Sequence, residues 1–489
     1  MKKIALLLLP VFVLFIPTAS DAQMVKFRKV IGNTGYDQGM SAIQTLDTGY
    51  VAVGSTSSSG AGSTDVFFVK TDSMGVVKGN LTFGGANIDR ATCVRQTADS
   101  GFVICGYSNS FGPGGYDIYV IKLNKYYQRV WEKAYGGDDW DFANAIRQTS
   151  DGGYIICGST YSFGNGDQDF YLIKTDANGD TTWTKTFGGI KEDVARSVVQ
   201  TSDGGYVVTG YTMSMGDLNG DCYTIRTDPA GDTLWTNRYG GSGVDKGNGV
   251  IEETTGGNIM IAGEATTGTN TDGTVIVLSP SGAYLTNYTF PSGPSYDNFN
   301  SISETPQGRF AMVGNTNSLG LNGDLQFLIL DNTLNYFSST TFGTIKNDYG
   351  YSAEPTMDKG YIICGTTNGF NNFLDDLYLI KTDSMGLANG TGSETFFYTG
   401  ISGPVAETAE NSLFYPNPAE DHIYIETDGN EKNALITVMD IAGKKLLERS
   451  ADVFAGTPFY MEFPELSNGV YFITLSGKTV TTSKLIINK

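Results

Sequence analysis

The sequence has 489 residues, a formal net charge of −20, and 63 glycines, 28 tyrosines and 27 phenylalanines. Aromatic residues with frequent glycine, and few long apolar stripes of helical period, are typical of many short strands joined by tight turns. The region after the first residues has no long run of lysine and arginine, so the positive surface that binds a phosphate backbone is lacking. These features favour an all-β protein and exclude nucleic acid as an expected partner.

The N-terminus has the pattern of a secretory signal peptide, which we place at residues 1–22. Lys2 and Lys3 supply its positive charge, an apolar stretch fills residues 4–16, and small residues at 20–22 offer a cleavage site. That apolar stretch is short for a membrane span, which needs about 20 apolar residues, and no other run reaches that length. We therefore expect an exported, soluble mature protein without a membrane span.

Export brings cysteines into oxidising conditions, yet the chain has only five of them, which is an odd and small number for its length. A disulfide framework is therefore not expected to hold the fold. Cys93 and Cys105 could face each other across a hairpin centred near Asp99. Whether they form a disulfide stays open, because the cross-strand geometry decides it.

A repeat with a period of about 52 residues fills most of the chain. One glycine ends the same apolar run in each copy, at Gly54, Gly106, Gly158, Gly210, Gly263, Gly314 and Gly365. The heptapeptide QTSDGGY occurs at 148–154 and again at 200–206, one period apart. A fixed period of this size predicts a solenoid or a propeller with seven copies of one unit.

The third copy predicts four strands, at residues 143–149, 154–160, 169–175 and 182–187. The turn at 151–153 contains an aspartate and two glycines, which turn chemistry explains without a catalytic role. The second and third strands are apolar on both faces, as expected of a sheet packed between two others. Each copy is therefore predicted to be one blade of a propeller.

The ends of the repeat predict a closed ring. The seventh copy supplies three strands only, whereas residues 27–32 at the N-terminus match the fourth strand of the third copy in pattern. An N-terminal strand that completes the last blade would remove an exposed sheet edge. We predict a seven-bladed β-propeller at 23–387, closed in this way, then a linker at 388–412 and a small β-sandwich at 413–489.

The C-terminal segment contains the runs YPNPAEDHIYI, ITVMDIAGKKL, LSNGVYFITL and KLIINK, in that order. Together they resemble the type A C-terminal sorting domain of the type IX secretion system. The landmark residues of the resemblance are Tyr415, Pro416, Asn417, Pro418, Gly443, Gly469, Tyr471, Lys484 and Lys489. The resemblance implies a Bacteroidetes-like source, transport through the periplasm to the outer surface or medium, and partnership with the secretion machinery and its sorting peptidase. The propeller resembles secreted bacterial repeat proteins with a DGGY hairpin and a KTDxxG turn, which implies no defined activity.

The residue types needed for common catalysis are scarce. His422, the only histidine, lies in the C-terminal segment, so histidine-based triads and histidine-ligated zinc are excluded from the propeller. The turns at 176–183 and 228–235 superficially resemble sialidase Asp-boxes, but the spacing of aspartate, glycine and tryptophan does not fit that motif. We expect a non-enzymatic protein. A hydrolase with a carboxylate pair stays open as an alternative, although nothing in the sequence singles out such a pair.

Aspartates precede the first strand of every copy, at Asp37, Asp89, Asp141, Asp193, Asp245, Asp297 and Asp348. A second set precedes the third strand, at Asp65, Asp117, Asp169, Asp221, Asp272, Asp324 and Asp376. Loops before the first and third strands of a meander emerge on one face, so both sets should ring one mouth of the propeller. We expect these acids to accept hydrogen bonds from loop amides, with no cofactor; Ca²⁺ binding by some pairs is the alternative.

Function is expected where the copies differ. The position before the first set of aspartates varies and includes three aromatic residues, Tyr36, Trp140 and Tyr296. Exposed aromatic side chains at a propeller mouth are suited to bind sugars or peptides, whereas packing against a neighbouring loop is the alternative. The sequence thus predicts a surface or secreted binding module for a glycan or protein, with a hydrolase or a purely structural component as alternatives.

Overall fold

The computed structural model describes residues 25–216, 219–290, 296–317, 323–344, 346–369, 374–388, 413–415, 422–427, 430–440, 444–454, 457, 459–463, 466–477 and 480–487. All of the secondary-structure elements that it describes are strands. The predicted signal peptide and almost all of the predicted linker lie outside the described residues. The chain separates into two compact units, residues 1–401 and 402–489, and each is described by itself.

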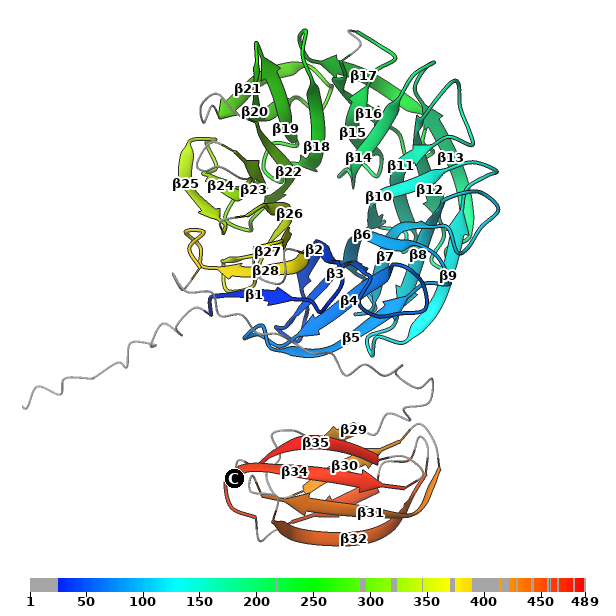
Figure 1. Ribbon diagram of the computed structural model, residues 1–489, viewed down its shortest axis with the longest axis vertical. Helices are drawn as coiled ribbons and strands as arrows, with labels where there is room; N and C mark the ends of the chain where they lie inside the picture. The colour runs from blue at the N-terminus through cyan, green and yellow to red at the C-terminus, as the bar shows by residue number, and fades with distance from the viewer. Residues whose placement is uncertain are drawn as a thin grey trace, which may run out of the picture. The chain divides into compact units, whose positions relative to one another are not determined.

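The first unit is a seven-bladed propeller, as predicted, with four antiparallel strands in each blade (Figure 1). The innermost strands are β2 (Asp37–Gln44), β6 (Asp89–Gln96), β10 (Asp141–Gln148), β14 (Asp193–Gln200), β18 (Asp245–Glu252), β22 (Asp297–Glu304) and β26 (Asp348–Pro355). The second strands are β3 (Tyr50–Thr56), β7 (Phe102–Ser108), β11 (Tyr154–Thr160), β15 (Tyr206–Thr212), β19 (Ile259–Thr267), β23 (Phe310–Thr316) and β27 (Tyr361–Thr367).

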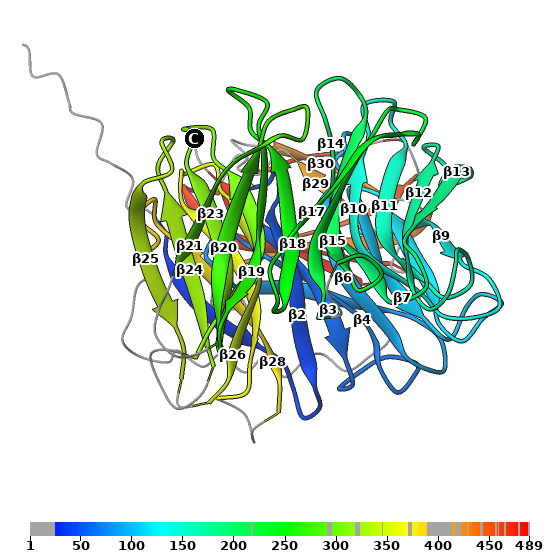
Figure 2. The ribbon, with the colours of Figure 1, turned by 90° about the horizontal axis from the view of Figure 1, so that it is seen from above.

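The two outer strands of each blade complete the meander. The third strands are β4 (Asp65–Thr71), β8 (Asp117–Leu123), β12 (Asp169–Thr175), β16 (Asp221–Thr227), β20 (Asn270–Leu278), β24 (Asp324–Leu330) and β28 (Asp376–Thr382). The fourth strands are β5 (Val77–Phe83), β9 (Arg129–Tyr135), β13 (Thr181–Phe187), β17 (Thr233–Tyr239), β21 (Tyr284–Phe290), β25 (Tyr336–Phe342) and, for the seventh blade, β1 (Phe27–Ile31). The strands run between two loop-bearing faces (Figure 2).

The N-terminal strand closes the ring, which confirms the prediction. β1 pairs antiparallel with β28, and Phe27 lies opposite Lys381 in the register. Figure 1 shows the blue β1 beside the yellow β28, although the two strands come from opposite ends of the repeat. The seventh blade therefore has four strands like the others, and no third strand is left as an open edge.

The core lies between the blades. Every position of β11 and β12 is buried, as the two-sided apolar pattern predicts. One cluster joins Ile155 and Leu172 of the third blade to Val198 and Tyr206 of the fourth. The innermost strand of the third blade begins at Asp141, two residues earlier than predicted, because Asp141 already pairs with Thr160 of β11.

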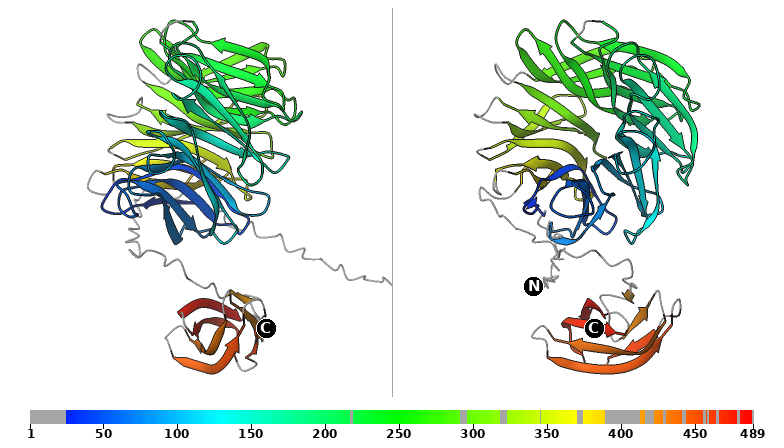
Figure 3. Two further views of the ribbon diagram at one scale, coloured as in Figure 1. Left: turned by 90° about the vertical axis from the view of Figure 1, so that its right-hand side faces the viewer. Right: turned by 45° about the vertical axis from the view of Figure 1, so that its right-hand side comes forward.

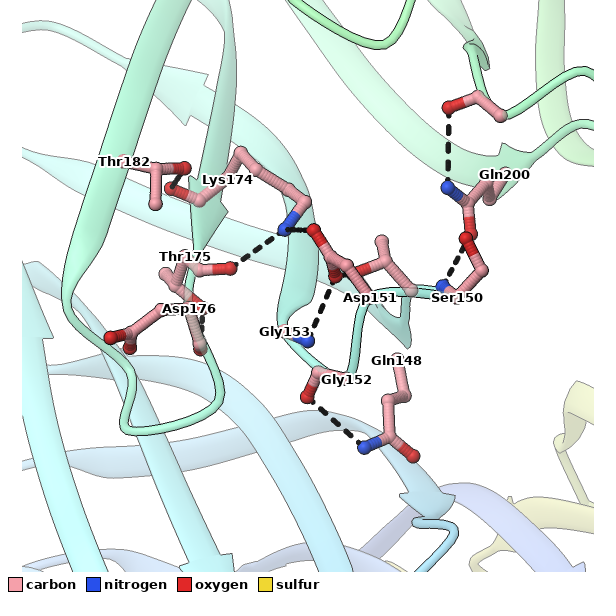
Figure 4. Close-up of polar contacts among 12 residues, drawn as sticks. Gln148, Ser150, Asp151, Gly152, Gly153, Lys174, Thr175, Asp176, Thr182 and Gln200 are labelled. Carbon is pink, nitrogen blue, oxygen red and sulfur yellow. Dashed lines mark hydrogen bonds and ion pairs between the residues drawn. The ribbon is translucent and has the colours of Figure 1, made fainter.

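The repeated heptapeptide forms a hairpin that hydrogen bonds and an ion pair hold together (Figure 4). Asp151 accepts hydrogen bonds from the Thr149 hydroxyl at 2.5 Å and from the Gly153 amide at 2.9 Å. The buried Lys174 ammonium from β12 lies 2.8 Å from the same carboxylate. The turn also needs a φ of +84° at Gly152, a backbone conformation that favours glycine.

Glutamine, the first residue of the heptapeptide, joins neighbouring blades. The side-chain oxygen of Gln200 accepts a hydrogen bond from the Ser150 amide of the preceding blade at 2.8 Å. The seventh blade connects to the first in the same way, because the Met357 amide donates to Gln44 at 2.7 Å. The heptapeptide recurs because each blade needs both the same hairpin and the same link to its neighbour.

The second unit is a small β-sandwich (Figure 3). One sheet has the order β29-β30-β33 and the other β32-β31-β34-β35. The strands are β29 (Leu413–Tyr415), β30 (His422–Glu426), β31 (Glu431–Met439), β32 (Lys445–Val453), β33 (Phe459–Glu462), β34 (Gly469–Ser476) and β35 (Val480–Ile487). Ile425 of the first sheet and Ile436 and Ile473 of the second belong to one buried cluster, so the sheets share a core.

Candidate ligand-binding face

The first set of aspartates lies at the blade junctions. The Asp141 amide donates to the Tyr116 carbonyl of the preceding blade at 2.6 Å, and the Asp193 amide donates to the Gln168 carbonyl, also at 2.6 Å. This contact joins the loop before a third strand to the start of the next innermost strand. Both sets of aspartates therefore lie on one face of the propeller, which we call the aspartate face.

The carboxylates of the first set fix loops. Asp141 is fully buried, and its Oδ2 accepts hydrogen bonds from the Gly137 amide at 2.9 Å and the Ser162 hydroxyl at 2.7 Å. Asp89 and Asp193 make the same pair of contacts in their own blades, with the amides of Gly85 and Gly189 and the hydroxyls of Ser110 and Ser214. This geometry favours the loop-fixing interpretation of the aspartates.

The second set of aspartates faces the first across a glycine. A Cβ added to Gly136 would lie 2.2 Å from Asp117 Oδ1 and 2.5 Å from Asp141 Oδ2. Asp117 Oδ1 and Asp141 Oδ1 are buried without a hydrogen-bond partner in the described part of the chain. Burial and then the negative charge of Asp141 raise the pKa of Asp117.

Calcium binding by these acids would need more oxygen ligands than the two carboxylates of one junction. Within the described residues, no group of three or more histidine, cysteine, aspartate or glutamate side chains is arranged to hold a metal ion. Each junction offers two carboxylates, whereas Ca²⁺ takes six to eight oxygen ligands. The effect of EDTA on the melting temperature tests whether a cation occupies the junctions.

The three predicted aromatic residues are exposed but belong to different blades. Tyr36 is 55% exposed, Trp140 48% and Tyr296 43%, in the first, third and sixth blades respectively. The hydroxyl of Tyr296 hydrogen-bonds to Glu264. The fold separates these residues along the ring of blades, so they do not form one site. Trp140 differs from the other two because it belongs to a larger aromatic group.

Five rings form what we call the aromatic cluster: Tyr107, Tyr116, Trp140, Phe142 and Tyr161. The Trp140 ring lies 5.8 Å from Tyr116 and 6.2 Å from Tyr161 between centroids, at interplanar angles of 85° and 81°. Phe142 lies 5.0 Å from Tyr107 and continues the cluster along the start of the innermost strand. Edge-to-face contacts of this kind hold large side chains in place, so the exposed Trp140 ring has a fixed position.

Sequence reasoning missed the other four members of the aromatic cluster. Tyr116 precedes an aspartate of the second set, and the equivalent residues in the other blades are Thr64, Gln168, Gly220, Thr271, Gly323 and Asp375. Tyr161 likewise follows the second strand at a position that differs between blades. The variation that identified Trp140 was therefore also present at these positions. Their proximity depends on blade packing, which the sequence does not give.

A depression of about 470 Å³ lies on the opposite face, between the hairpins of the third and fourth blades. Its walls include Asp151, Lys174, Trp183, Tyr206 and Pro229. The Lys174 ammonium donates to the Thr175 carbonyl at 2.8 Å in addition to its pairing with Asp151 (Figure 4). The charged groups of this depression are therefore already used to hold the hairpin.

Two cysteines face each other, as their spacing allows. Cys93 of β6 lies opposite Cys105 of β7 in the register, and both are buried free thiols. The disulfide that the sequence left open is therefore absent between these two residues.

The landmark residues of the C-terminal segment are partly described. Gly469 begins β34, and the Tyr471 hydroxyl in this strand donates to the Ser467 carbonyl at 2.8 Å. Tyr415 lies in β29 and Lys484 in β35. The remaining landmarks lie outside the described residues: Pro416, Asn417, Pro418, Gly443 and Lys489. No helix in the described ranges is long and apolar enough to cross a membrane.

Comparison with solved structures finds likenesses of low sequence identity. PorZ, described as an essential bacterial surface component of the type IX secretion system of Porphyromonas gingivalis, is 11% identical with a TM-score of 0.42. The match covers 94% of the present chain and 60% of PorZ, so the chain spans less than two thirds of PorZ. Sqt1 of Chaetomium thermophilum, bound to the N-terminus of a ribosomal protein, is 11% identical with a TM-score of 0.45, covering 72% of this chain and 99% of Sqt1.

Comparison with known sequences identifies the second unit. No curated protein matches the chain. Residues 413–488 match the family described as secretion system C-terminal sorting domain. This match agrees with the four sequence runs and indicates export to the cell surface or secretion. The C-terminal sandwich therefore belongs to the sorting domains of the type IX secretion system, and it follows a seven-bladed β-propeller in this chain.

Proposed function

We propose that the protein is a non-enzymatic binding module, displayed on the cell surface or secreted, whose propeller holds an extracellular glycan or protein ligand. The aromatic cluster carries this proposal. Trp140 and Tyr161 are 48% and 39% exposed while edge-to-face contacts with their neighbours hold them in place. A rigid exposed aromatic surface gives contact area at a low entropic cost, which is the property of a binding site.

The carboxylates of the aspartate face support a non-enzymatic role. A glycosidase needs two carboxyl groups that reach the substrate from opposite sides of the scissile bond. Asp117 and Asp141 are fully buried behind their loops, and one oxygen of Asp141 already accepts two hydrogen bonds from loop residues. Hydrolysis of a polysaccharide or peptide by the purified protein would favour the alternative function, an extracellular hydrolase.

A glycan and protein array tests the proposal with three forms of the full mature chain. We expect wild type to bind at least one class of ligand, and Trp140→Ala to lose that binding because the ring forms the exposed part of the aromatic cluster. Tyr126→Ala is the matched control, because Tyr126 is 45% exposed in the turn after β8, on the opposite face. Binding by all three forms alike, or by none, would favour a site elsewhere or the third alternative, a structural surface component.

A further inference from the structure

The loops around the aromatic cluster carry an excess of negative charge. The charged residues of the loops at 136–140, 161–168 and 188–192 are Asp138, Asp139, Asp167, Lys191 and Glu192. Asp138, Asp139 and Asp167 are exposed, and no salt bridge involves them within the described part of the chain. These loops thus carry four acids and one base beside the two exposed rings, and the positive charge of Arg90 acts on Tyr107 within the aromatic cluster.

The acids lie close enough to act on the rings. Asp139 Oδ1 accepts a hydrogen bond from the Trp140 amide at 2.9 Å, and the Asp139 amide donates to the Ser162 hydroxyl at 3.0 Å. These two bonds hold the carboxylate at the base of Trp140. Burial raises the pKa of Tyr161, and the negative charges of Glu192, Asp167 and Asp139 raise it further.

This combination occurs in the third blade. In the third blade, Asp138 and Asp139 directly precede Trp140. The two residues at the equivalent positions of the other blades, in chain order, are Thr-Gly, Ala-Asn, Ile-Lys, Ser-Gly, Pro-Ser and Ile-Lys. A structural need shared by all seven blades does not explain an acid pair that one blade has. The pair adjoins Trp140, the residue that distinguishes this blade's rim.

We propose that the aromatic cluster binds a basic peptide segment, with an arginine or lysine side chain against Trp140 and Tyr161 and with Asp138 and Asp139 as counter-charges. The inference rests on the proposed binding function and specifies its ligand. A cation is attracted to the face of an aromatic ring, and near-perpendicular rings offer it two walls. The net charge of −20 adds long-range attraction for a basic partner and repels an acidic one.

Binding by the full mature chain is measured by fluorescence anisotropy with three labelled peptides of equal length. Glycine alternates with arginine in the first, with glutamate in the second and with glutamine in the third, and a labelled neutral oligosaccharide is the fourth probe. We expect the arginine peptide to bind and the other probes not to bind. Raising the salt concentration should weaken the binding, because salt screens exposed charges.

Variants locate the site. Asp138→Asn with Asp139→Asn removes two charges at constant side-chain size, and Trp140→Ala removes the ring. Each is expected to weaken arginine-peptide binding by about three- to tenfold, the range of one exposed cation–π or charge contact. Asp180→Asn with Asp232→Asn is the charge-matched control, because these side chains are 72% and 70% exposed on the opposite face. Thermal unfolding confirms that each variant is folded.

Three results would overturn the inference alone, and a fourth would overturn the proposed binding function as well. The first is that the arginine peptide does not bind wild type. The second is that the control pair weakens binding as much as the Asp138 and Asp139 pair, because net charge alone would then explain the attraction. The third is that the oligosaccharide binds and depends on Trp140 but not on the two aspartates; the aromatic cluster would then be a glycan site, and the proposed binding function would stand. Binding that is unchanged in Trp140→Ala would overturn both proposals.

Discussion

Asp117 and Asp151 show how one residue type has opposite electrostatic roles on the two faces of the propeller. Burial raises the pKa of Asp151, but hydrogen bonds from Lys174 and Thr149 outweigh it and lower the pKa to about 2. Burial raises the pKa of Asp117, and the negative charge of the facing Asp141 carboxylate raises it further. The folded protein is therefore more stable with Asp151 charged and with Asp117 neutral.

The pH dependence of stability follows from these shifts. A carboxyl with a raised pKa contributes stability at low pH that is lost as the pH rises through its folded pKa. At pH 7 the charge of Asp117 therefore opposes folding. Asp151 contributes stability above about pH 4 that is lost as the pH falls toward its folded pKa of about 2.

We predict that Asp117→Asn raises the melting temperature at pH 7 by roughly 1–3 °C and that the gain disappears near pH 3. The asparagine oxygen can still accept the hydrogen bond from the Gly114 amide. Asp151→Asn should lower the melting temperature at pH 7 by more than about 2 °C, because Lys174 loses its counter-charge. Thermal unfolding followed by circular dichroism at both pH values measures the shifts.

The same measurement tests calcium. EDTA should leave the melting temperature of wild type unchanged, because we expect hydrogen bonds and no cation to hold the junctions. If a cation stabilised the junctions, its removal by EDTA would lower the melting temperature. If Asp117 were a calcium ligand, Asp117→Asn and EDTA would each lower the melting temperature at pH 7. A fall in both experiments would contradict the loop-fixing interpretation.

Trp140 and its neighbours show what residue patterns predict and what they leave out. The exposure of Trp140 followed from its position in the repeat, because the core that all blades share is built from positions that stay apolar in every blade, and this position varies. The contacts of Trp140 with Tyr116 and Tyr161 did not follow, because they join three loops of two blades. A repeat fixes the position of each residue within its blade, whereas the packing angle between blades decides which exposed side chains meet.

Strand β1 is more deeply buried than the fourth strands of other blades. Phe27, Val30 and Ile31 of β1 are buried, whereas no residue of β13 is buried. The Phe27 ring packs 5.5 Å from Tyr50 of the first blade between centroids, at an angle of 71°. β1 thus completes the seventh blade and also packs against the first blade, so it joins the two ends of the ring.

The strands could be predicted from the sequence because glycine and aspartate recur in the loops and turns between them in each period. Where the repeat decays, the structure still follows it. The lysine that pairs with the hairpin aspartate is replaced by Val277 in the fifth blade and by Ile329 in the sixth, and both blades keep four strands. Burial of the second and third strands therefore maintains the blade, and the charged hairpin contact is an addition to it.

We predict that a mature chain starting at Asn33 in place of Gln23 unfolds at a much lower temperature and self-associates. Without β1, strand β28 has an unpaired edge, and an unpaired edge is a template for pairing with a second chain. Differential scanning calorimetry and size-exclusion chromatography measure the two effects. A truncated chain that stays monomeric with a melting temperature near that of wild type would show that β1 is dispensable for closure.

The two compact units place the sorting domain and the proposed ligand-binding face in different parts of the chain. The buried cluster of the sorting domain, which includes Ile425, Ile436 and Ile473, lies within residues 402–489. The propeller is closed by its own N-terminal strand and needs no strand from the second unit. Each unit thus has a complete core, so each should fold without the other.

We predict that a chain lacking Leu413 to Lys489 folds into the propeller and accumulates in the periplasm of a bacterium with a type IX secretion system. The reason is that the family match, and with it the transport signal, lies within residues 413–488. The converse fusion, residues 402–489 placed after a signal peptide and a reporter enzyme, should carry the reporter across the outer membrane. Immunoblots of periplasm, cell surface and medium measure location, and circular dichroism of the purified truncated chain measures folding. A truncated chain in the medium of intact cells, or a propeller that does not fold alone, would contradict this division.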